Sequence, residues 1–516
     1  MRLNNQKQLR AGVALSYVQM AVAIVIQLVY TPFALRILGD NEYGLMQTAF
    51  STVAMLSVLS LGFNSSYIRY YARYKQNNDA QAIHKLNGLF LILFCILGSV
   101  VLASGLFLAG NLELVFDDGL TAQEYATGRV LLIIATVNLA MSFARSVFSN
   151  IITAHERYVF LKCVAMVESV GTPVINFVVL YFGMRSVALA VVSLVLGLIV
   201  FALYGVYVLS VLKQKFIFRA FEKGLLKSLF CFTSFIVINM IVDQINNQVD
   251  KLVLARFCGT AVVTLYSVGI NFSNYYTQFS TAISGIFTPQ VHQMVISTEK
   301  DPVLQRKTLT DFFTSVGRIQ FFLLALIMSG FILFGQSFLM LWVGPEYNAS
   351  YYVALVCMLP GTIPLIQNVG IEIQRAENLH HYRSYIYGII AIFNLLISIQ
   401  LCQIWGAVGA AIGTGVACLL GNGLIMNIFY HKKINIDMLV FWRSILRQLL
   451  GLVPAMAVGC VIAQVGKFTG WLQLVGGIAI YVAAYLLSAW LFAMNPKEKD
   501  LVGRVAQKFL HRGVVE

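Results

Sequence analysis

The sequence is poor in charge. Only 11% of its 516 residues are Asp, Glu, Lys or Arg, and 59% are hydrophobic, whereas soluble domains carry about 25% charged residues. No water-soluble core could bury this much apolar surface, so the composition excludes a soluble globular protein and predicts a polytopic membrane protein. The net charge of +14 would suggest a nucleic-acid partner in a soluble chain. Here we assign it to membrane topology and expect no nucleic-acid partner.

The chain also lacks the patterns of disulfide, metal and catalytic sites. Its eight cysteines include no C-x-x-C pair and lie in or near apolar runs, which is typical of small buried side chains. No Walker A, H-E-x-x-H or G-x-S-x-G pattern occurs, and none of the seven histidines lies in the middle of a predicted span. No external loop is long enough for a catalytic domain. We therefore predict no enzyme, such as a glycan polymerase, ligase or acyltransferase, and no resident cofactor.

Long apolar stretches dominate what is present. About fourteen of them are long enough to cross a bilayer as a helix, and they predict an all-α polytopic membrane protein. They lie near residues 11–35, 43–66, 87–109, 128–152, 160–182, 187–211, 228–250, 263–291, 312–334, 350–374, 384–403, 407–430, 444–465 and 471–493.

Basic residues orient these spans. With a cytoplasmic N-terminus, 28 Lys and Arg fall in cytoplasmic segments, six fall in external segments and two fall within spans. Such an excess on one side is the signature of cytoplasmic loops. It predicts that both termini are cytoplasmic and that the protein is a multi-pass protein of the cytoplasmic (inner) membrane. The first apolar run continues to about Leu35, which is too long for a signal-peptide core, so we expect it to remain as a span.

Short motifs recur at an offset of about 220 residues. "LRILG", with Arg36 and Gly39, returns as "ARFCG", with Arg256 and Gly259; "TAHER" returns as "QRAEN", and "YFGMRSVALA" as "IWGAVGAAIG". The echoes predict two six-span lobes related by a pseudo-two-fold axis along the membrane normal, followed by a C-terminal helix pair. The predicted parts are an N-lobe (1–212), a connector (213–227), a C-lobe (228–431), appended spans (432–495) and a basic cytoplasmic tail (496–516).

Three segments carry a resemblance to a known family. "PFALRILGDNEYGLMQTA", "VDKLVLARFCGTAVVTLYSVG" and "IWGAVGAAIGTGVA" resemble polysaccharide or oligosaccharide flippases of the Wzx type, which are members of the multidrug/oligosaccharidyl-lipid/polysaccharide exporter superfamily. The resemblance covers nearly the whole chain. It implies a V-shaped pair of six-helix lobes around a central cavity, and alternating access for an undecaprenyl-diphosphate-linked glycan.

Polar side chains line up on single faces of several spans. Positions 0, 4, 7 and 11 of a helix share a face. A single Asn or Ser there usually joins two helices, but aligned groups predict the wall of a path that suits sugars. The predicted cavity residues of this kind are Gln19, Gln27, Asn138, Ser142, Asn271, Asn274 and Gln278.

Two arginines, Arg145 and Arg318, fall within predicted spans. Ionisable groups there cost roughly 2.5–3.5 kcal/mol each on insertion scales and are functional by default. A guanidinium binds a diphosphate as a fork, so both are candidate contacts for the substrate's diphosphate. The alternative is an internal ion pair, for example with Glu168 or Asp311, or extension of the side chain toward the cytoplasm.

Acidic residues supply the candidate ion site. Asp243, flanked by Asn239 and Asn246 in the seventh span, is our candidate to bind a coupling Na⁺ or H⁺; the alternative is a salt bridge across the lobe. A second set is assigned to external gating or to local ion pairs, and it comprises Arg36, Asp250, Arg256, Glu372 and Arg375.

The predicted function is a flippase. It moves an undecaprenyl-diphosphate-linked oligosaccharide, such as an O-antigen or exopolysaccharide unit, to the external leaflet, and a cation gradient drives it. The partners are then this lipid-linked substrate and membrane lipid, with a glycan polymerase or export machinery beside them. One alternative is a cation-coupled multidrug exporter, for which a cavity rich in carboxylates and poor in arginine would be expected. Another is a lipid II-type flippase, whose first-span arginines have no counterpart in residues 11–35.

The connector region is basic and amphipathic. Residues 212–228, "LKQKFIFRAFEKGLLKS", interleave lysines and an arginine with phenylalanines. Such a segment is typical of the membrane interface. We interpret it as an anchor on anionic lipid, with recruitment of an anionic lipid-linked substrate as the alternative.

Overall fold

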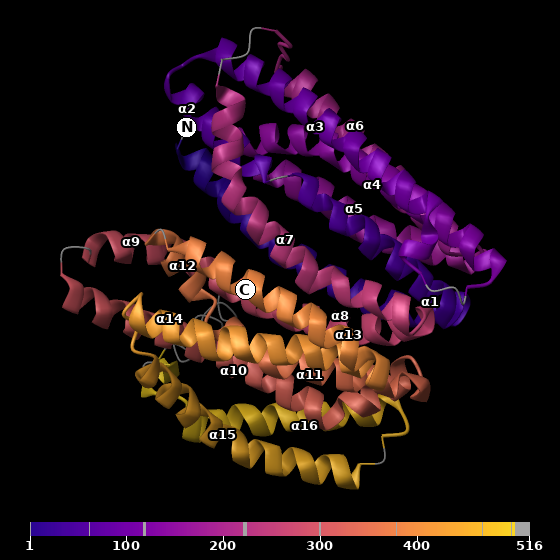
Figure 1. The fold of residues 1–516 in the computed structure, drawn as a ribbon. Coiled ribbons are helices and arrows are strands. Elements are labelled where there is room, and N and C mark those ends of the chain that lie inside the picture. Colours follow the sequence, from indigo (N-terminus) through magenta and orange to yellow (C-terminus); the bar gives the residue numbers. More distant parts are fainter. Residues whose placement is uncertain are drawn as a thin grey trace, which may run out of the picture. The chain divides into compact units, whose positions relative to one another are not determined.

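The structure, a computed structural model, is built of helices joined by short turns and loops (Figure 1). It describes residues 2–60, 62–116, 120–219, 224–298, 301–377, 379–466, 468–496 and 498–500. Within these ranges sixteen α-helices and no β-strand are found. The side chains of residues 2–14 and of several residues in 225–239, including Asn239, lie outside the description. The predicted all-α class is confirmed.

The sixteen helices are taken in chain order, as a first group of eight and a second group of eight. The first group comprises α1 (Arg2–Met55), α2 (Phe63–Gln76), α3 (Ala80–Gly110), α4 (Ala122–Ala154), α5 (Tyr158–Tyr181), α6 (Ser186–Val206), α7 (Leu225–Phe257) and α8 (Thr260–Ser284). The second comprises α9 (Thr288–Thr298), α10 (Pro302–Trp342), α11 (Asn348–Ile366), α12 (Val369–Ala376), α13 (His380–Cys418), α14 (Met426–Lys432), α15 (Met438–Val465) and α16 (Trp471–Ser488).

Ten segments of the described chain are long and apolar enough to cross a membrane. Two of them are double, because α1 and α13 each contain a glycine with non-helical dihedrals. Gly39 has φ 77° and Gly406 has φ 56°, a region that glycine adopts without the steric cost that a Cβ would bring. The helices α7 and α8, of 33 and 25 residues, account for the two remaining predicted spans. The polytopic architecture is therefore confirmed, and the count of about fourteen crossings stays a prediction.

The chain divides into two compact units. Unit 1 comprises Met1–Val268 and Ser384–Thr414, and unit 2 comprises Gly269–Arg383 and Gly415–Glu516. In unit 1, α3 packs along α4, α4 against α6, and α1 against both α5 and α7. Unit 1 extends beyond the predicted connector because α7 is bound to α1: Gln244 donates to the Ser57 hydroxyl at 3.0 Å, and Lys251 to Gln47 Oε1 at 3.3 Å.

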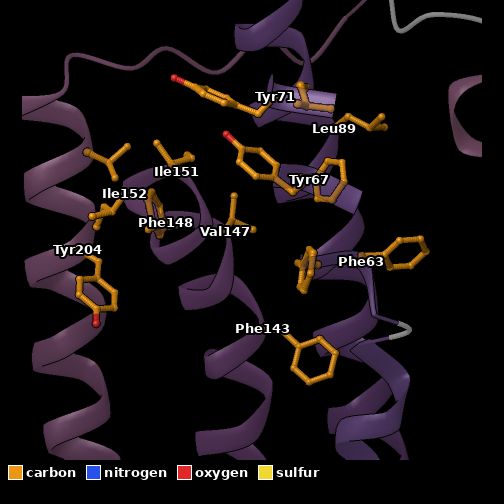
Figure 2. Close-up of a cluster of buried hydrophobic side chains, with 14 of the residues drawn as sticks. Phe63, Tyr67, Tyr71, Leu89, Phe143, Val147, Phe148, Ile151, Ile152 and Tyr204 are labelled. Atoms are coloured by element: carbon orange, nitrogen blue, oxygen red, sulfur yellow. The ribbon is translucent and has the colours of Figure 1, made fainter. Parts of the chain in front are cut away.

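An aromatic cluster closes one end of unit 1 where α2 meets α3, α4 and α6 (Figure 2). Phe63, Tyr67 and Tyr71 point into it from α2, and Phe143 and Phe148 enter from α4. Between membrane helices such contacts stabilise by close van der Waals packing rather than by removal from water. The cluster therefore fixes the short helix α2 to the ends of the long helices.

In unit 2 the long helix α10 is the central element. It packs against α11, α15 and α16, while α9 packs against α12. The two C-terminal helices are thus attached to α10 rather than separate from the bundle. Tyr485 of α16 donates a 2.7 Å hydrogen bond to the backbone carbonyl of Phe322 in α10, so this attachment has polar as well as apolar contacts.

Candidate functional site

A buried carboxylate, Asp250, lies near the end of α7. Its side chain is 3% exposed, and its Oδ2 accepts hydrogen bonds from the hydroxyls of Tyr266 at 2.7 Å and Thr414 at 2.6 Å. These partners come from the start of α8 and the end of α13, so three helices of unit 1 meet at this carboxylate. Both partners are neutral. A charged carboxylate buried among neutral groups is costly unless a cation or proton compensates it.

The geometry of α13 brings further oxygen atoms to the same place. The chain folds back at Gly406, so the segments before and after it run side by side. Ser398 Oγ lies 3.4 Å from the Ala410 carbonyl, and Asn394 lies 3.4 Å from Thr414 Oγ1. Glycines allow this approach: a Cβ on Gly413 would lie 2.4 Å from Ser398 Oγ. The tight hairpin therefore places one side chain from each arm beside α7.

The resulting set of ligands is made of oxygen. It comprises the Asp250 carboxylate, the Asn394 amide oxygen, the Ser398 and Thr414 hydroxyls, and the Ala410 carbonyl. Hard cations prefer such ligands. One carboxylate with neutral oxygens fits a monovalent cation, or a proton on Asp250 itself. These residues form our candidate ion site.

The neighbouring cations of α7 have other partners. Arg256 donates to the backbone carbonyls of Glu113 and Phe116 at 2.7 and 2.6 Å, and Lys251 contacts Gln47. Asp250 and Arg256 were both predicted as gate or ion-pair residues. In the structure Arg256 holds the segment after α3, whereas Asp250 is the centre of the candidate ion site.

A second polar group in unit 1 surrounds Arg145. Its Nη1 lies 2.7 Å from Glu168 Oε1, and the two side chains are 23% and 36% exposed. Gln19 of α1 donates to the Ser169 hydroxyl at 3.2 Å, one residue beyond Glu168. The helices α1, α4 and α5 therefore form two polar contacts at this level of α5: Arg145–Glu168 with α4 and Gln19–Ser169 with α1. The first is the internal ion pair that the sequence left open as an alternative.

Arg318 has a different environment in unit 2. Its side chain is 6% exposed and forms a two-pronged pair with Glu498, from Nε to Oε1 at 2.6 Å and from Nη2 to Oε2 at 2.8 Å. Nη1 donates to the carbonyl and the hydroxyl of Ser444, and Nη2 to the Ala493 carbonyl. All five N–H donors of the guanidinium are engaged. Arg318 thus joins α10 to α15 and to the chain after α16, and none of its donors is left for a diphosphate.

The remaining predicted cavity residues belong to both units. In unit 1 the Gln27 carbonyl accepts from Thr31, Ser142 donates to the Leu139 carbonyl, and Asn138 faces Gly197. Asn271, Asn274 and Gln278 of α8 belong to unit 2. Whether the two sets line one path stays a prediction.

The other predicted ion and gate residues are more exposed. Asp243 is exposed on α7, and its backbone carbonyl accepts a 2.7 Å hydrogen bond from the Asn247 side chain. Asn246 is half-buried, and the side chain of Asn239 lies outside the described part of the structure. Arg36 is exposed on α1. Glu372 and Arg375 form an ion pair of 2.7 Å one turn apart on α12.

Four residues around Asp250 whose side chains form the candidate ion site or donate to the carboxylate were not predicted: Tyr266, Asn394, Ser398 and Thr414. Asn394 and Ser398 do share a helix face at i and i+4, which is a weak signal. Each of the four taken singly is typical of helix packing. The fold-back of α13 at Gly406 brings Asn394, Ser398 and Thr414 together, and Tyr266 reaches Asp250 from α8.

The chain matches known sequences over most of its length. The family model described as "Polysaccharide biosynthesis protein" matches residues 9–295, more than half of the chain. An uncharacterized membrane protein of Methanocaldococcus jannaschii is 23% identical over an alignment of 506 positions, which covers 92% of this chain and 95% of that protein.

Solved structures share the fold. The lipid II flippase MurJ in its inward closed conformation aligns with a TM-score of 0.68 at 14% identity, covering 95% of this chain and 99% of that one. An inward-facing multidrug resistance transporter of the MATE family, in the MOP superfamily, aligns with a TM-score of 0.58 at 13% identity, covering 80% and 96%. At these identities the likeness concerns the fold.

Proposed function

Because the chain belongs to the polysaccharide biosynthesis protein family, we propose that it is a flippase for a lipid-linked oligosaccharide. It would carry an undecaprenyl-diphosphate-linked repeat unit from the cytoplasmic to the external leaflet of the inner membrane, with both termini in the cytoplasm. A glycan polymerase or export machinery would take up the product. The observation that carries the transport part of this proposal is Asp250, buried among neutral oxygen ligands between α7 and α13.

Asp250 couples the movement of helices to a cation gradient in this proposal. When Na⁺ or a proton neutralises its carboxylate, α7 and both arms of α13 stay packed around it. When the cation leaves, the buried charge is left with hydroxyl donors alone and the packed arrangement loses stability. A ligand shifts a conformational equilibrium by its difference in affinity for the two states, so the ion favours one state of the alternating-access cycle.

Arg145 is the proposed contact for the diphosphate. In the structure its guanidinium is paired with Glu168, which keeps the charge neutralised while no substrate is bound. A diphosphate carries more negative charge than one carboxylate and accepts a fork of hydrogen bonds, so it can displace Glu168. Gln19 and Ser169 then offer an amide and a hydroxyl to sugar hydroxyls beside it. The prenyl chain stays in the lipid.

Two other functions remain open within this fold. A cation-coupled multidrug exporter is supported by the likeness to the MATE transporter, and a lipid II-type flippase by the likeness to MurJ. Arg145 favours an anionic substrate over cationic drugs. The absence of Lys and Arg from residues 11–35 favours a glycan carrier other than a lipid II-type flippase.

The test is a flipping assay with the purified full chain in proteoliposomes. Fluorescently labelled undecaprenyl-diphosphate oligosaccharide, a lipid II analogue and a cationic dye are compared, each with an imposed Na⁺ gradient, an imposed pH gradient or none. We expect the oligosaccharide lipid to be moved fastest and to respond to one gradient. Preferential movement of the dye or of the lipid II analogue would replace the proposed substrate by that alternative.

A further inference from the structure

Residues 212–219 form a non-helical segment that follows α6 and its last turn, and we call it the strap. It begins where the candidate span Ser186–Val211 ends, so it lies at a membrane surface. It belongs to unit 1. Neither the candidate ion site nor the Arg145 group involves it, although it is the first part of the basic, aromatic connector region singled out by the sequence.

Polar groups at the start of α3 fix the strap. The backbone N–H of Ile217 donates to the His84 carbonyl at 3.0 Å, and Asn87 Nδ2 donates to the Lys215 carbonyl at 3.3 Å. Asn87 is fully buried, and its Oδ1 accepts from the Tyr67 hydroxyl at 2.7 Å. The Asn87 amide therefore joins the aromatic cluster on one side and the strap on the other.

Packing fixes the strap as well. A Cβ on Gly88 would lie 2.1 Å from the Ile217 carbonyl oxygen, so the strap crosses α3 at a distance that only glycine allows. The Phe216 ring packs edge-on against Phe148, with ring centroids 5.9 Å apart. Both contacts hold the strap to unit 1 as a preformed surface.

The outer side of the strap combines cations with apolar side chains. Lys213, Lys215 and Arg219 are exposed. Lys213 has φ 49°, so the chain turns there before it crosses α3; Lys213 and Lys215 both remain exposed on either side of the half-buried Gln214, while Phe216 packs against the aromatic cluster. Exposed Val211 and Phe218 lie beside these cations in the sequence. Apolar groups that enter lipid next to cations at the level of phosphate are typical of the membrane interface.

We propose that the strap is a preformed binding surface for the headgroups of anionic phospholipids. The occupant is a bilayer lipid because the cations directly follow a membrane span and stand among exposed apolar side chains. Asn87 and Gly88 are positioning residues: they hold the lysines in place without contacting the lipid. Binding there would tie unit 1 to one leaflet at the end of α6, independently of the substrate that is carried.

Limited trypsin digestion of the full chain tests the proposal, since trypsin cleaves after Lys213, Lys215 and Arg219. The chain is reconstituted in nanodiscs of phosphatidylcholine, with or without phosphatidylglycerol, and the peptides are quantified by mass spectrometry. Each lysine near an anionic surface strengthens binding by about fivefold, so phosphatidylglycerol should slow cleavage at these bonds severalfold. Equal cleavage in both lipids would overturn the proposal. Protection by inorganic pyrophosphate in neutral nanodiscs, but not by phosphatidylglycerol, would overturn it too.

Two glycine variants separate a preformed surface from charge alone. Gly88→Ala keeps every cation but pushes the strap off α3, whereas Gly205→Ala is the matched control, since a Cβ there meets no atom within 4 Å. We expect phosphatidylglycerol to protect the Gly205→Ala strap but not the Gly88→Ala strap. Protection of Gly88→Ala would overturn the preformed surface.

The double variant Lys213→Gln/Lys215→Gln alters exposed side chains only. In this double variant, phosphatidylglycerol should slow trypsin cleavage after Arg219 much less than it does in the unsubstituted chain. If phosphatidylglycerol slowed that cleavage equally in both, the role of the lysines would be overturned.

Discussion

The hydroxyl of Thr414 donates a 2.6 Å hydrogen bond to the carboxylate of Asp250, which lies 164 positions earlier in the chain. Thr414 follows the fold-back of α13 at Gly406, and Asp250 lies near the end of α7. The bond therefore joins the second arm of α13 to a buried charge on another helix. A change in the ionisation or ion occupancy of Asp250 must alter this contact, which gives the proposed coupling a defined structural link.

The substitution Thr414→Val should weaken cation binding without removing the carboxylate. The substitution removes one oxygen ligand of the candidate site at nearly constant volume, so the Na⁺ concentration that half-saturates transport should rise severalfold. The matched control is Thr362→Val in unit 2, where the Thr362 hydroxyl contacts Tyr276 at 2.8 Å and no charge is involved. Cation titration of the flipping rate measures both; an equal shift in the two variants would contradict the site.

The substitution Arg145→Ala should slow transport of the diphosphate-linked substrate by about tenfold or more, because a charge-assisted contact is lost, and should affect a neutral prenyl analogue less. Glu168→Gln should keep Arg145 and lower the KM for the diphosphate substrate, since the competing carboxylate is gone. Arg375→Ala, in an exposed pair, is the control with an effect near zero. Equal losses for charged and neutral substrates in Arg145→Ala would reject the diphosphate contact.

Breaking the Arg318–Glu498 pair should destabilise the protein. Glu498→Gln leaves a buried guanidinium with a neutral partner, and removal of one member of a buried pair costs about 3–5 kcal/mol. The pair of Arg306 with Asp437, at 3.5 Å and half-exposed, supplies the comparison: Arg306→Gln should cost about 1 kcal/mol or less. Thermal unfolding measures both. Equal melting temperatures for Glu498→Gln and the unsubstituted chain would contradict the buried clamp.

Glu377 should make stability depend on pH. It lies between α12 and α13, outside the candidate spans, and burial raises the pKa of its carboxyl from 4.5 to about 7. In that interval the folded protein holds the proton and the unfolded chain does not, so the free energy of unfolding falls as pH rises from about 4.5 to about 7. Glu377→Gln should flatten the melting temperature across this window. If the melting temperature of Glu377→Gln still fell with pH as steeply as that of the unsubstituted chain, the pH dependence would belong to another group.

The helical fold could be read from the sequence because a membrane span is defined by length and apolar composition. The internal echoes also have a local structural counterpart. Gly39 and Gly259, at the ends of "LRILG" and "ARFCG", both have positive φ, at 77° and 85°, as do Gly183 and Gly406, at 76° and 56°. Glycine adopts such dihedrals without the steric cost of a Cβ, so each of these paired glycines lies at a turn, and the relation between two repeated lobes stays a prediction.

The candidate ion site could be predicted only in part. Asp250 was noticed because it is an acidic residue near a span, but the sequence placed it with its neighbours Lys251 and Arg256. Its actual partner Thr414 depends on the hairpin at Gly406, a tertiary feature without a local signal. The same holds for Arg318, whose partner Glu498 is 180 positions away. Arg145 and Glu168, only 23 positions apart on adjacent helices, could be proposed as a pair.

The central claim is that Asp250 binds the coupling cation, and the most direct measurement compares Asp250→Asn with Asp243→Asn in the proteoliposome flipping assay. Both substitutions remove one carboxylate at nearly constant volume from the same helix. We predict that Asp250→Asn abolishes the response of transport to imposed Na⁺ and pH gradients, whereas Asp243→Asn retains it. A full gradient response in Asp250→Asn, with or without its loss in Asp243→Asn, would contradict the claim.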